Sequence, residues 1–243
     1  MAVIRENKYN MIDKQARKDI ERLKGIIINV KDYGAKGDGS SIDKDSIQSV
    51  LDLALTRESL TVYFPAGKYV LNGPMQVYSN THLILDEQAI ITRQQHGALL
   101  MNGEYEGDIQ YGNIHIEGGI WDAHNIVNEY SGSVHFVLGN ADNITINNCV
   151  FMNNHGNHAL DIAGCENVTV RDCSFIGQLP DPNTSRYYVE AIQIAEFTEE
   201  GQPAWGDGWN NRPCKNVLID NCFFDKNYKD ERFSGYGSAV GTH

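Results

Sequence analysis

Short alternations of apolar and polar residues dominate the chain from about residue 82 onward. Alternation over four or five residues predicts β-strands with one buried face. Five segments share the pattern and can be aligned on it: 82–91, 113–122, 143–152, 167–176 and 216–225. Their alternating apolar pairs are Leu83/Leu85, Ile114/Ile116, Ile144/Ile146, Val168/Val170 and Val217/Ile219.

Two further columns appear in the same alignment. An isoleucine or aromatic residue follows each pair at a fixed offset, at Ile90, Trp121, Phe151, Phe175 and Phe224. An asparagine stands just ahead of four of the pairs, at Asn113, Asn143, Asn167 and Asn216. Stacked asparagine amides can bond to one another and satisfy the backbone of a turn.

The repeat length decides the architecture. Segment 156–177 repeats segment 132–153 at a spacing of about 24 residues, which is too short for a βαβ unit, and no helical pattern lies between the strands. Rungs of this length pair by coiling, each strand against its copy in the next rung. The sequence therefore predicts an all-β solenoid, a single-stranded parallel β-helix.

A different pattern precedes the repeats and predicts an N-terminal cap. Residues 43–55 place Ile47, Val50, Leu51 and Ala54 on one helical face, with Ser41 or Asp43 as the candidate N-cap. Residues 61–71 then predict two strands around a Pro-Ala-Gly turn. We expect a β-helix domain over 28–243, truncated at its C-terminus, because the last rung stops soon after Ala239 and Val240, which align with Ala191 and Ile192.

Residues 1–27 are expected to form a helical stem. Met11 or Ile12, Ala16, Ile20 and Leu23 lie on one apolar stripe between charged flanks. The stripe could pack on the cap, or it could associate with other copies, as in a homotrimeric appendage.

Charge and composition limit the partners. The net charge of -12 leaves no basic stripe for nucleic acid. No apolar run approaches the roughly 18 residues of a membrane span, and residues 1–25 lack the apolar core of a secretion signal. A carboxylate-rich chain suits a polysaccharide partner built from neutral or cationic sugars. No loop has a calcium-binding pattern, so we expect neither a metal nor another cofactor.

The five cysteines fit the repeat better than a metal site. Cys149, Cys173 and Cys222 share one repeat position, and Cys165 and Cys214 share another, with no CxxC spacing. The interpretation is two stacks of small apolar residues.

One polar column stands out. Leu160/Ile162 and Ile192/Ile194 must point inward, so Asp161 and Gln193 point outward, with His158 and Glu190 at the leading edge of each strand. Neighbouring rungs lie about 4.8 Å apart, which predicts one solvent-facing patch. The earlier rung carries Val134 and Val137 instead.

We assign Glu190 as the first candidate catalytic carboxylate, His158 as its neighbour and Asp161 as the second acid. Asp207 would enter from a loop, and His243 would lie one rung further along. The alternative is that these are ordinary solvated residues on a sheet face.

Two insertions open beside this column, at 178–189 and 196–213, and loops on one edge of a solenoid commonly build its binding site. With Gln193, their aromatic residues are the candidate substrate contacts, because aromatic faces stack on sugar rings: Tyr187, Tyr188, Trp205 and Trp209. The alternative role of these aromatics is to pin the loops to the body.

The opening "VKDYGAKGDGSSIDKDSIQSVLDLA" followed by "VYFPAGKYVL" closely resembles that of the pectate-lyase-like superfamily of right-handed β-helices. That superfamily includes family-28 glycoside hydrolases, polysaccharide lyases and phage tailspike or appendage proteins. The stretch "HALDI…EAIQI…SAVGTH" looks like a family-28-related subgroup. The polygalacturonase motifs Asn-Thr-Asp, Asp-Asp and Arg-Ile-Lys do not occur, which argues against that activity.

The resemblance implies a polysaccharide-degrading enzyme, and the two carboxylates favour a glycoside hydrolase acting on a bacterial surface or cell-wall glycan. The first alternative is a non-catalytic glycan-binding phage fibre or appendage module, and the second is a polysaccharide lyase. A purely structural spacer is a further alternative. The expected location is a virion tail or the extracellular space.

Overall fold

The computed structural model describes residues 27–94, 97–103, 111–125, 133–179, 189–200 and 208–242. The expected stem falls almost wholly outside these residues. So do five of the candidate site residues: Tyr187, Tyr188, Trp205, Asp207 and His243.

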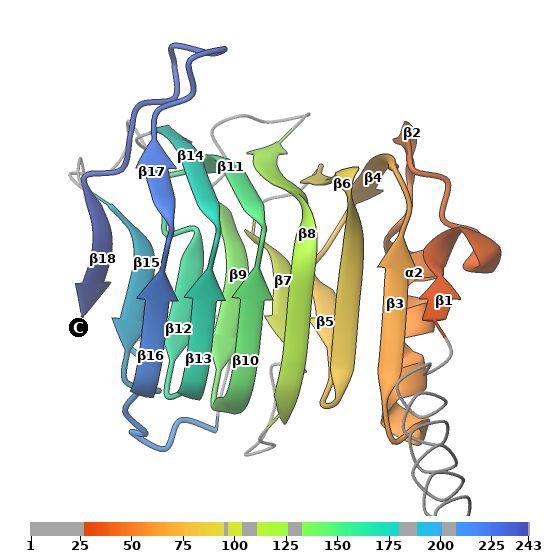
Figure 1. Ribbon diagram of the computed structural model, residues 1–243, viewed down its shortest axis with the longest axis horizontal. Coiled ribbons are helices and arrows are strands. Elements are labelled where there is room, and N and C mark those ends of the chain that lie inside the picture. The colour runs from red at the N-terminus through yellow and green to blue at the C-terminus, as the bar shows by residue number, and fades with distance from the viewer. Residues whose placement is uncertain are drawn as a thin grey trace, which may run out of the picture.

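The described strands coil into a right-handed parallel β-helix with three faces (Figure 1). Face 1 consists, in spatial order, of β1 (Ile27–Asn29), β3 (Leu60–Phe64), the first part of β6 (Thr81–Arg93), the first part of β8 (Tyr111–Asn125), β10 (Ala141–Asn147), β13 (Glu166–Arg171) and β16 (Lys215–Asp220). Face 2 consists of β2 (Asp38–Ile42), β4 (Gly67–Leu71), the later parts of β6 and β8, β11 (Val150–His155), β14 (Ser174–Leu179) and β17 (Phe223–Asp225). Face 3 consists of β5 (Met75–Val77), β7 (Gly97–Asn102), β9 (Ser133–Gly139), β12 (Leu160–Ala163), β15 (Glu190–Ala195) and β18 (Ser238–Thr242).

Each complete rung has three strands, whereas the repeat suggested two. The segment containing Cys-x-Phe is a strand of its own on face 2, since the chain bends sharply between faces 1 and 2. Residues in the left-handed backbone region make this bend in the later rungs, at Asn148, Asp172 and Asn221 with φ of 54°, 53° and 49°. Asparagine and aspartate tolerate this conformation better than most residues.

The register of the later rungs is confirmed. Ile144 pairs with Val168, and Val168 pairs with Val217. The aromatic column also stacks inside the coil: Phe151 and Phe175 have ring centroids 5.0 Å apart, and Phe175 and Phe224 4.9 Å. Burial of these repeated apolar positions supplies the core.

The alignment of segment 82–91 was wrong, by two residues at Leu83 and by one residue at Ile90. Leu83 pairs with Ile116, not with Ile114, and Ile90 pairs with Ile120 rather than with Trp121. Thr81, which is fully buried, takes the inward position that Ile114 occupies in the next rung. In this rung the first inward position is therefore the polar Thr81, and the apolar inward residues begin only at Leu83.

The expected asparagine column exists and extends one rung further than predicted. Side-chain amides donate successively from Asn216 to Asn167, Asn143, Asn113 and Asn80 at 3.0, 3.2, 3.2 and 3.0 Å. All five backbones have φ between 53° and 59°. The hydrogen-bonded ladder thus stabilises a turn whose backbone lies in the left-handed region, a conformation that asparagine adopts more readily than most residues.

The N-terminal cap contains α2 (Lys44–Leu51) and a 3₁₀ turn, η2 (Asp52–Thr56), where the sequence predicted one helix. Ile47, Val50 and Leu51 are buried against the first rung. Asp43 is the N-cap residue, but its carboxylate accepts from the backbone N–H groups of Lys36 and Gly37 at 2.6 and 3.1 Å. Among the described residues, no helix has the length and apolar character needed to span a membrane.

The cysteines occupy the two expected columns, and all five are free thiols. The backbone N–H of Cys165 lies 3.3 Å from Sγ of Cys214, and the rungs of Cys149, Cys173 and Cys222 are adjacent. Burial raises the pKa of the Cys165 thiol far above its ordinary value. These thiols therefore pack as small apolar side chains.

Candidate functional site

The candidate polar residues come from β12 and β15, which are adjacent strands of face 3. Leu160 pairs with Ile192 and Ile162 with Ile194 inside the coil, as predicted. On the outer side Asp161 pairs with Gln193. Alternation along two strands in register therefore brings the polar residues together.

His158 contacts Glu190 across these rungs. Its Nδ1 lies 3.0 Å from the backbone carbonyl oxygen of Glu190 and 3.4 Å from the Glu190 carboxylate oxygen Oε2. Both partners are acceptors, so Nδ1 carries the hydrogen and donates it. In a neutral ring, Nε2 is then the basic nitrogen.

Asp161 is buried, with 9% of its surface exposed. Its neighbours in register are Val137 on one side and Gln193 on the other. Burial disfavours the charged carboxylate and raises the pKa of Asp161 to about 7. At slightly acidic pH this side chain is a neutral acid that can donate a proton.

The predicted patch faces solvent only in part, and this corrects the expectation. His158 is 5% exposed, whereas Glu190 and Gln193 are half-buried. The outer side of face 3 is not generally solvated, because its side chains pack into a second hydrophobic cluster. That cluster consists of Ala98, Met101, Val134, Val137, Ala163, Ala195 and Phe197.

Trp209 is half-buried against this second cluster. Of the two roles weighed for it, the contact fits the one that pins its loop to the body. The backbone agrees, since Phe197 N–H donates to the Arg212 carbonyl oxygen at 2.8 Å, and Asn211 N–H donates to the Phe197 carbonyl oxygen at 3.0 Å.

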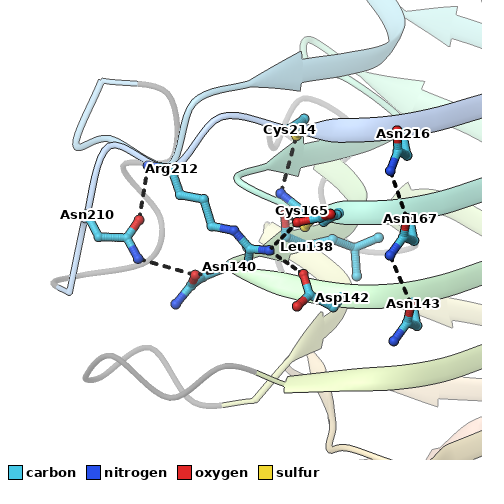
Figure 2. A network of polar contacts seen from close by, with 12 residues as sticks. Leu138, Asn140, Asp142, Asn143, Cys165, Asn167, Asn210, Arg212, Cys214 and Asn216 are labelled. Atoms are coloured by element: carbon cyan, nitrogen blue, oxygen red, sulfur yellow. Dashed lines mark hydrogen bonds and ion pairs between the residues drawn. The ribbon is translucent and has the colours of Figure 1, made fainter.

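Arg212, near the C-terminal end of the same insertion, also anchors it (Figure 2). Its guanidinium forms an ion pair with Asp142 and lies 3.5 Å from the Glu166 carboxylate. Asn210 donates from Nδ2 to Oδ1 of Asn140 at 3.3 Å. The loop that follows β15 is thereby held to the turn leading into face 1.

Gly241 is a site residue that the sequence analysis missed. It pairs with Gln193 on the next rung, and a side chain there would collide with Glu190, whose Oε1 would lie 2.7 Å from an added Cβ. The missing side chain leaves room for the Glu190 carboxylate. The sequence did contain a signal for this role, because Gly241 is a glycine at an outward-facing position of the segment "SAVGTH".

The assembled groups are a buried acid, a carboxylate and an imidazole oriented by it, which together suit proton transfer. The described residues include no group of three or more His, Cys, Asp or Glu side chains that could hold a metal ion. His155 ends β11 and is 2% exposed.

Comparison with known families supports this fold. Residues 27–110 match the model of a family described as "Rhamnogalacturonase A/epimerase, pectate lyase-like". The chain is 33% identical over 259 residues to "Plasmin and fibronectin-binding protein A" of Streptococcus pneumoniae, covering 95% of this chain and 35% of that protein. It is 41% identical over 63 residues to the mannuronan C5-epimerase AlgE2 of Azotobacter vinelandii, covering 23% of this chain and 6% of the epimerase.

A solved structure agrees over most of the chain. The crystal structure of PfbA, a surface adhesin of Streptococcus pneumoniae, superposes with a TM-score of 0.77 at 32% identity, covering 89% of this chain and 53% of that one. The chain thus spans about half of that structure and about a third of the curated streptococcal relative. It is related both to polysaccharide-acting enzymes and to a surface adhesin. The chain belongs to the pectate-lyase-like superfamily of right-handed parallel β-helix proteins.

Proposed function

We propose that this chain hydrolyses a glycan, with Asp161 as the general acid and Glu190 as the second carboxylate. The observation that carries the proposal is the environment of Asp161, whose burial raises its pKa to about 7 beside the Glu190–His158 contact. Glycoside hydrolysis needs one protonated carboxyl group and one carboxylate on either side of the bond.

The roles follow from the contacts. Asp161 would protonate the leaving oxygen, because it keeps its proton near neutral pH. Glu190 would activate water or attack the sugar, and the His158 N–H orients its carboxylate. Gln193, in register with Asp161, would bond a sugar hydroxyl. A lyase instead needs a base beside a charge-neutralising cation, which is the less favoured reaction.

Release of new reducing ends from bacterial cell-wall and capsular glycans tests the proposal. Asp161→Asn and Glu190→Gln should each lower turnover about a hundredfold or more, while the control Asp220→Asn, at an exposed carboxyl group on face 1, should not. Full activity in both site variants would reject the assignment. An ultraviolet-absorbing unsaturated product would identify elimination instead of hydrolysis.

A second candidate is a binding module without catalysis. It is favoured by the 33% identity over 95% of this chain to a protein named for binding plasmin and fibronectin. Binding of the chain to immobilised plasmin, fibronectin and bacterial glycans, with no turnover of any glycan tested, would favour it. Glu190→Gln should then change neither outcome unless the ligand occupies the same site.

The location proposed is a cell surface or the extracellular space, by analogy with the streptococcal surface adhesin. A virion tail and a homotrimer assembled through the stem are alternatives. Fractionation of producing cells and light scattering of the purified chain would distinguish them.

A further inference from the structure

The asparagine ladder has a direction. Each amide donates its Nδ2–H to the Oδ1 of the asparagine one rung nearer the N-terminus, ending at Asn80. Aligned hydrogen bonds polarise one another, so partial positive charge collects at the Asn80 end. Within the part of the chain that the structure describes, Nδ2 of Asn80 has no hydrogen-bond acceptor. The ladder therefore ends in an unused amide donor.

A hollow of about 260 Å³ lies at this end of the ladder, on the outer side of face 1. Apart from Leu60 its lining residues have polar side chains, among them Glu58, Ser59, Asn80, His82, Asn113 and His115. Pockets for drug-sized ligands have volumes of about 300 to 1,000 Å³. This hollow is smaller, so a molecule of about one ring fits it.

The lining presents both donors and acceptors. The rings of His82 and His115 meet edge-on with centroids 5.8 Å apart, and Nε2 of His82 lies 3.6 Å from the Glu117 carboxylate. That contact orients an Nε2–H toward Glu117 and leaves Nδ1 of a neutral ring as an acceptor. Burial, followed by the neighbouring His115, lowers the pKa of His82, so the ring is neutral at neutral pH.

We propose that this hollow binds one neutral sugar ring of a glycan. A hydroxyl group can accept from the Asn80 amide and donate to an imidazole or to Glu58, which neither a metal cation nor an anion without a proton can do. The carboxylates of Glu58 and Glu117 repel an anionic sugar, and the chain's net charge of -12 adds to that repulsion.

This second site is separate from the candidate catalytic site. It lies on face 1 at β3, β6 and β8, whereas His158, Asp161 and Glu190 lie on face 3, at β12 and β15 or just before β12 (Figure 1). A glycan held here would be tethered to the module without occupying the catalytic groups. The inference therefore does not depend on hydrolysis.

Titration followed by amide nuclear magnetic resonance tests the proposal. The probes are the methyl glycosides of glucose, galactose and N-acetylglucosamine, with methyl glucuronoside as the anionic comparator. At least one neutral glycoside should cause saturable shifts of the Asn80 side-chain amide at millimolar concentration, and the glucuronoside should bind more weakly.

Asn80→Asp is the sharpest variant. Aspartate tolerates the backbone φ of 59° and keeps an Oδ1 acceptor for Asn113, but it lacks the Nδ2 donor. Binding, followed through the His115 ring, should weaken roughly fivefold or more. His115→Thr, which copies Thr145 of the next rung, should also weaken it.

Two controls separate this site from the rest of the surface. Thr169→Ala, further along the His115 column, and Asp220→Asn, at an exposed carboxyl group of β16, should both leave sugar binding unchanged. No saturable shift with any neutral glycoside, tighter binding of the glucuronoside, or unchanged binding by Asn80→Asp would each overturn the proposal.

Discussion

Nδ1 of His158 lies 3.4 Å from Oε2 of Glu190, and the two residues belong to adjacent rungs of face 3. They are 32 positions apart in the sequence. Their contact depends on the stacking register, because a one-residue slip would turn one of them toward the core. Any change that moves the Glu190 side chain should therefore act on His158 as well.

Gly241→Ala should displace Glu190 without unfolding the coil. An added Cβ would collide with the Glu190 side chain, which must then swing away from His158. If the proposed hydrolysis is correct, turnover should fall at least about tenfold, and the His158 ring resonances should shift. Gly73→Ala, where nothing lies within 4 Å of the new Cβ, is the matched control. Unshifted His158 resonances in Gly241→Ala would contradict the packing argument.

Asp161 should make the stability of the chain depend on pH. The folded state keeps this proton up to about pH 7, whereas the unfolded chain releases it near pH 4. The folded state thus binds more protons in this window, and the free energy of unfolding falls as pH rises through it. Asp161→Asn should remove that fall, gaining on the order of 3 kcal/mol relative to the wild type between pH 4 and pH 8.

Urea unfolding of the two proteins at both pH values measures this difference, and the contributions of other groups cancel in the comparison. Asp220→Asn, at an exposed carboxyl, controls for loss of a surface charge. An equal pH dependence in wild type and Asp161→Asn would mean that Asp161 is solvated like an ordinary carboxyl group.

Asn143→Ala should destabilise the coil by about 2 kcal/mol, for two separable reasons. The substitution removes the hydrogen bonds to Asn113 and Asn167, which are exposed and contribute modestly. It also forces alanine into a backbone φ of 57°, at a cost of about 1 kcal/mol. Asn143→Gly removes only the hydrogen bonds and should cost about half as much in chemical denaturation. Equal losses in the two variants would rule out backbone strain.

The register of the later rungs was predictable because its signal is local. Alternating apolar pairs and an asparagine at a fixed distance mark the same position in each copy, as at Asn143 and Asn167. The alternation of apolar residues predicted the wrong register in the rung where one inward position is polar. Thr81 interrupts the apolar alternation, so Asn80 rather than Leu83 marks the register of that rung.

The side-chain directions in the candidate site could likewise be predicted, but their burial could not. The outer side of face 3 is partly covered because its apolar residues pack with Phe197 and Trp209, which belong to a later insertion. The repeat pattern of the sequence describes only the rungs, so it does not predict how an insertion between them packs against the coil. The alignment of Val240 with Ile192 already placed Gly241 opposite Gln193, but the close approach of Gly241 to the Glu190 side chain was missed, since it involves the space between rungs.

Arg212→Ala should loosen the insertion after β15 more than it weakens the coil. Asp142 and Glu166 are in register on adjacent strands, and Arg212 contacts both carboxylates. Its removal leaves two like charges side by side, with an expected loss of about 1–2 kcal/mol in the free energy of unfolding. Added salt should restore part of that loss by screening the repulsion.

Amide hydrogen exchange locates the effect of Arg212→Ala. Exchange should accelerate at Phe197 and Asn211, whose N–H groups bond across the base of the insertion, and should stay slow at Val168 in β13. Arg171→Ala removes an exposed arginine paired with Asp220 at 3.0 Å and should change stability by less than about 1 kcal/mol. If both variants leave exchange at Phe197 unchanged, the loop is held by Trp209 and the second hydrophobic cluster, and Arg212 is dispensable.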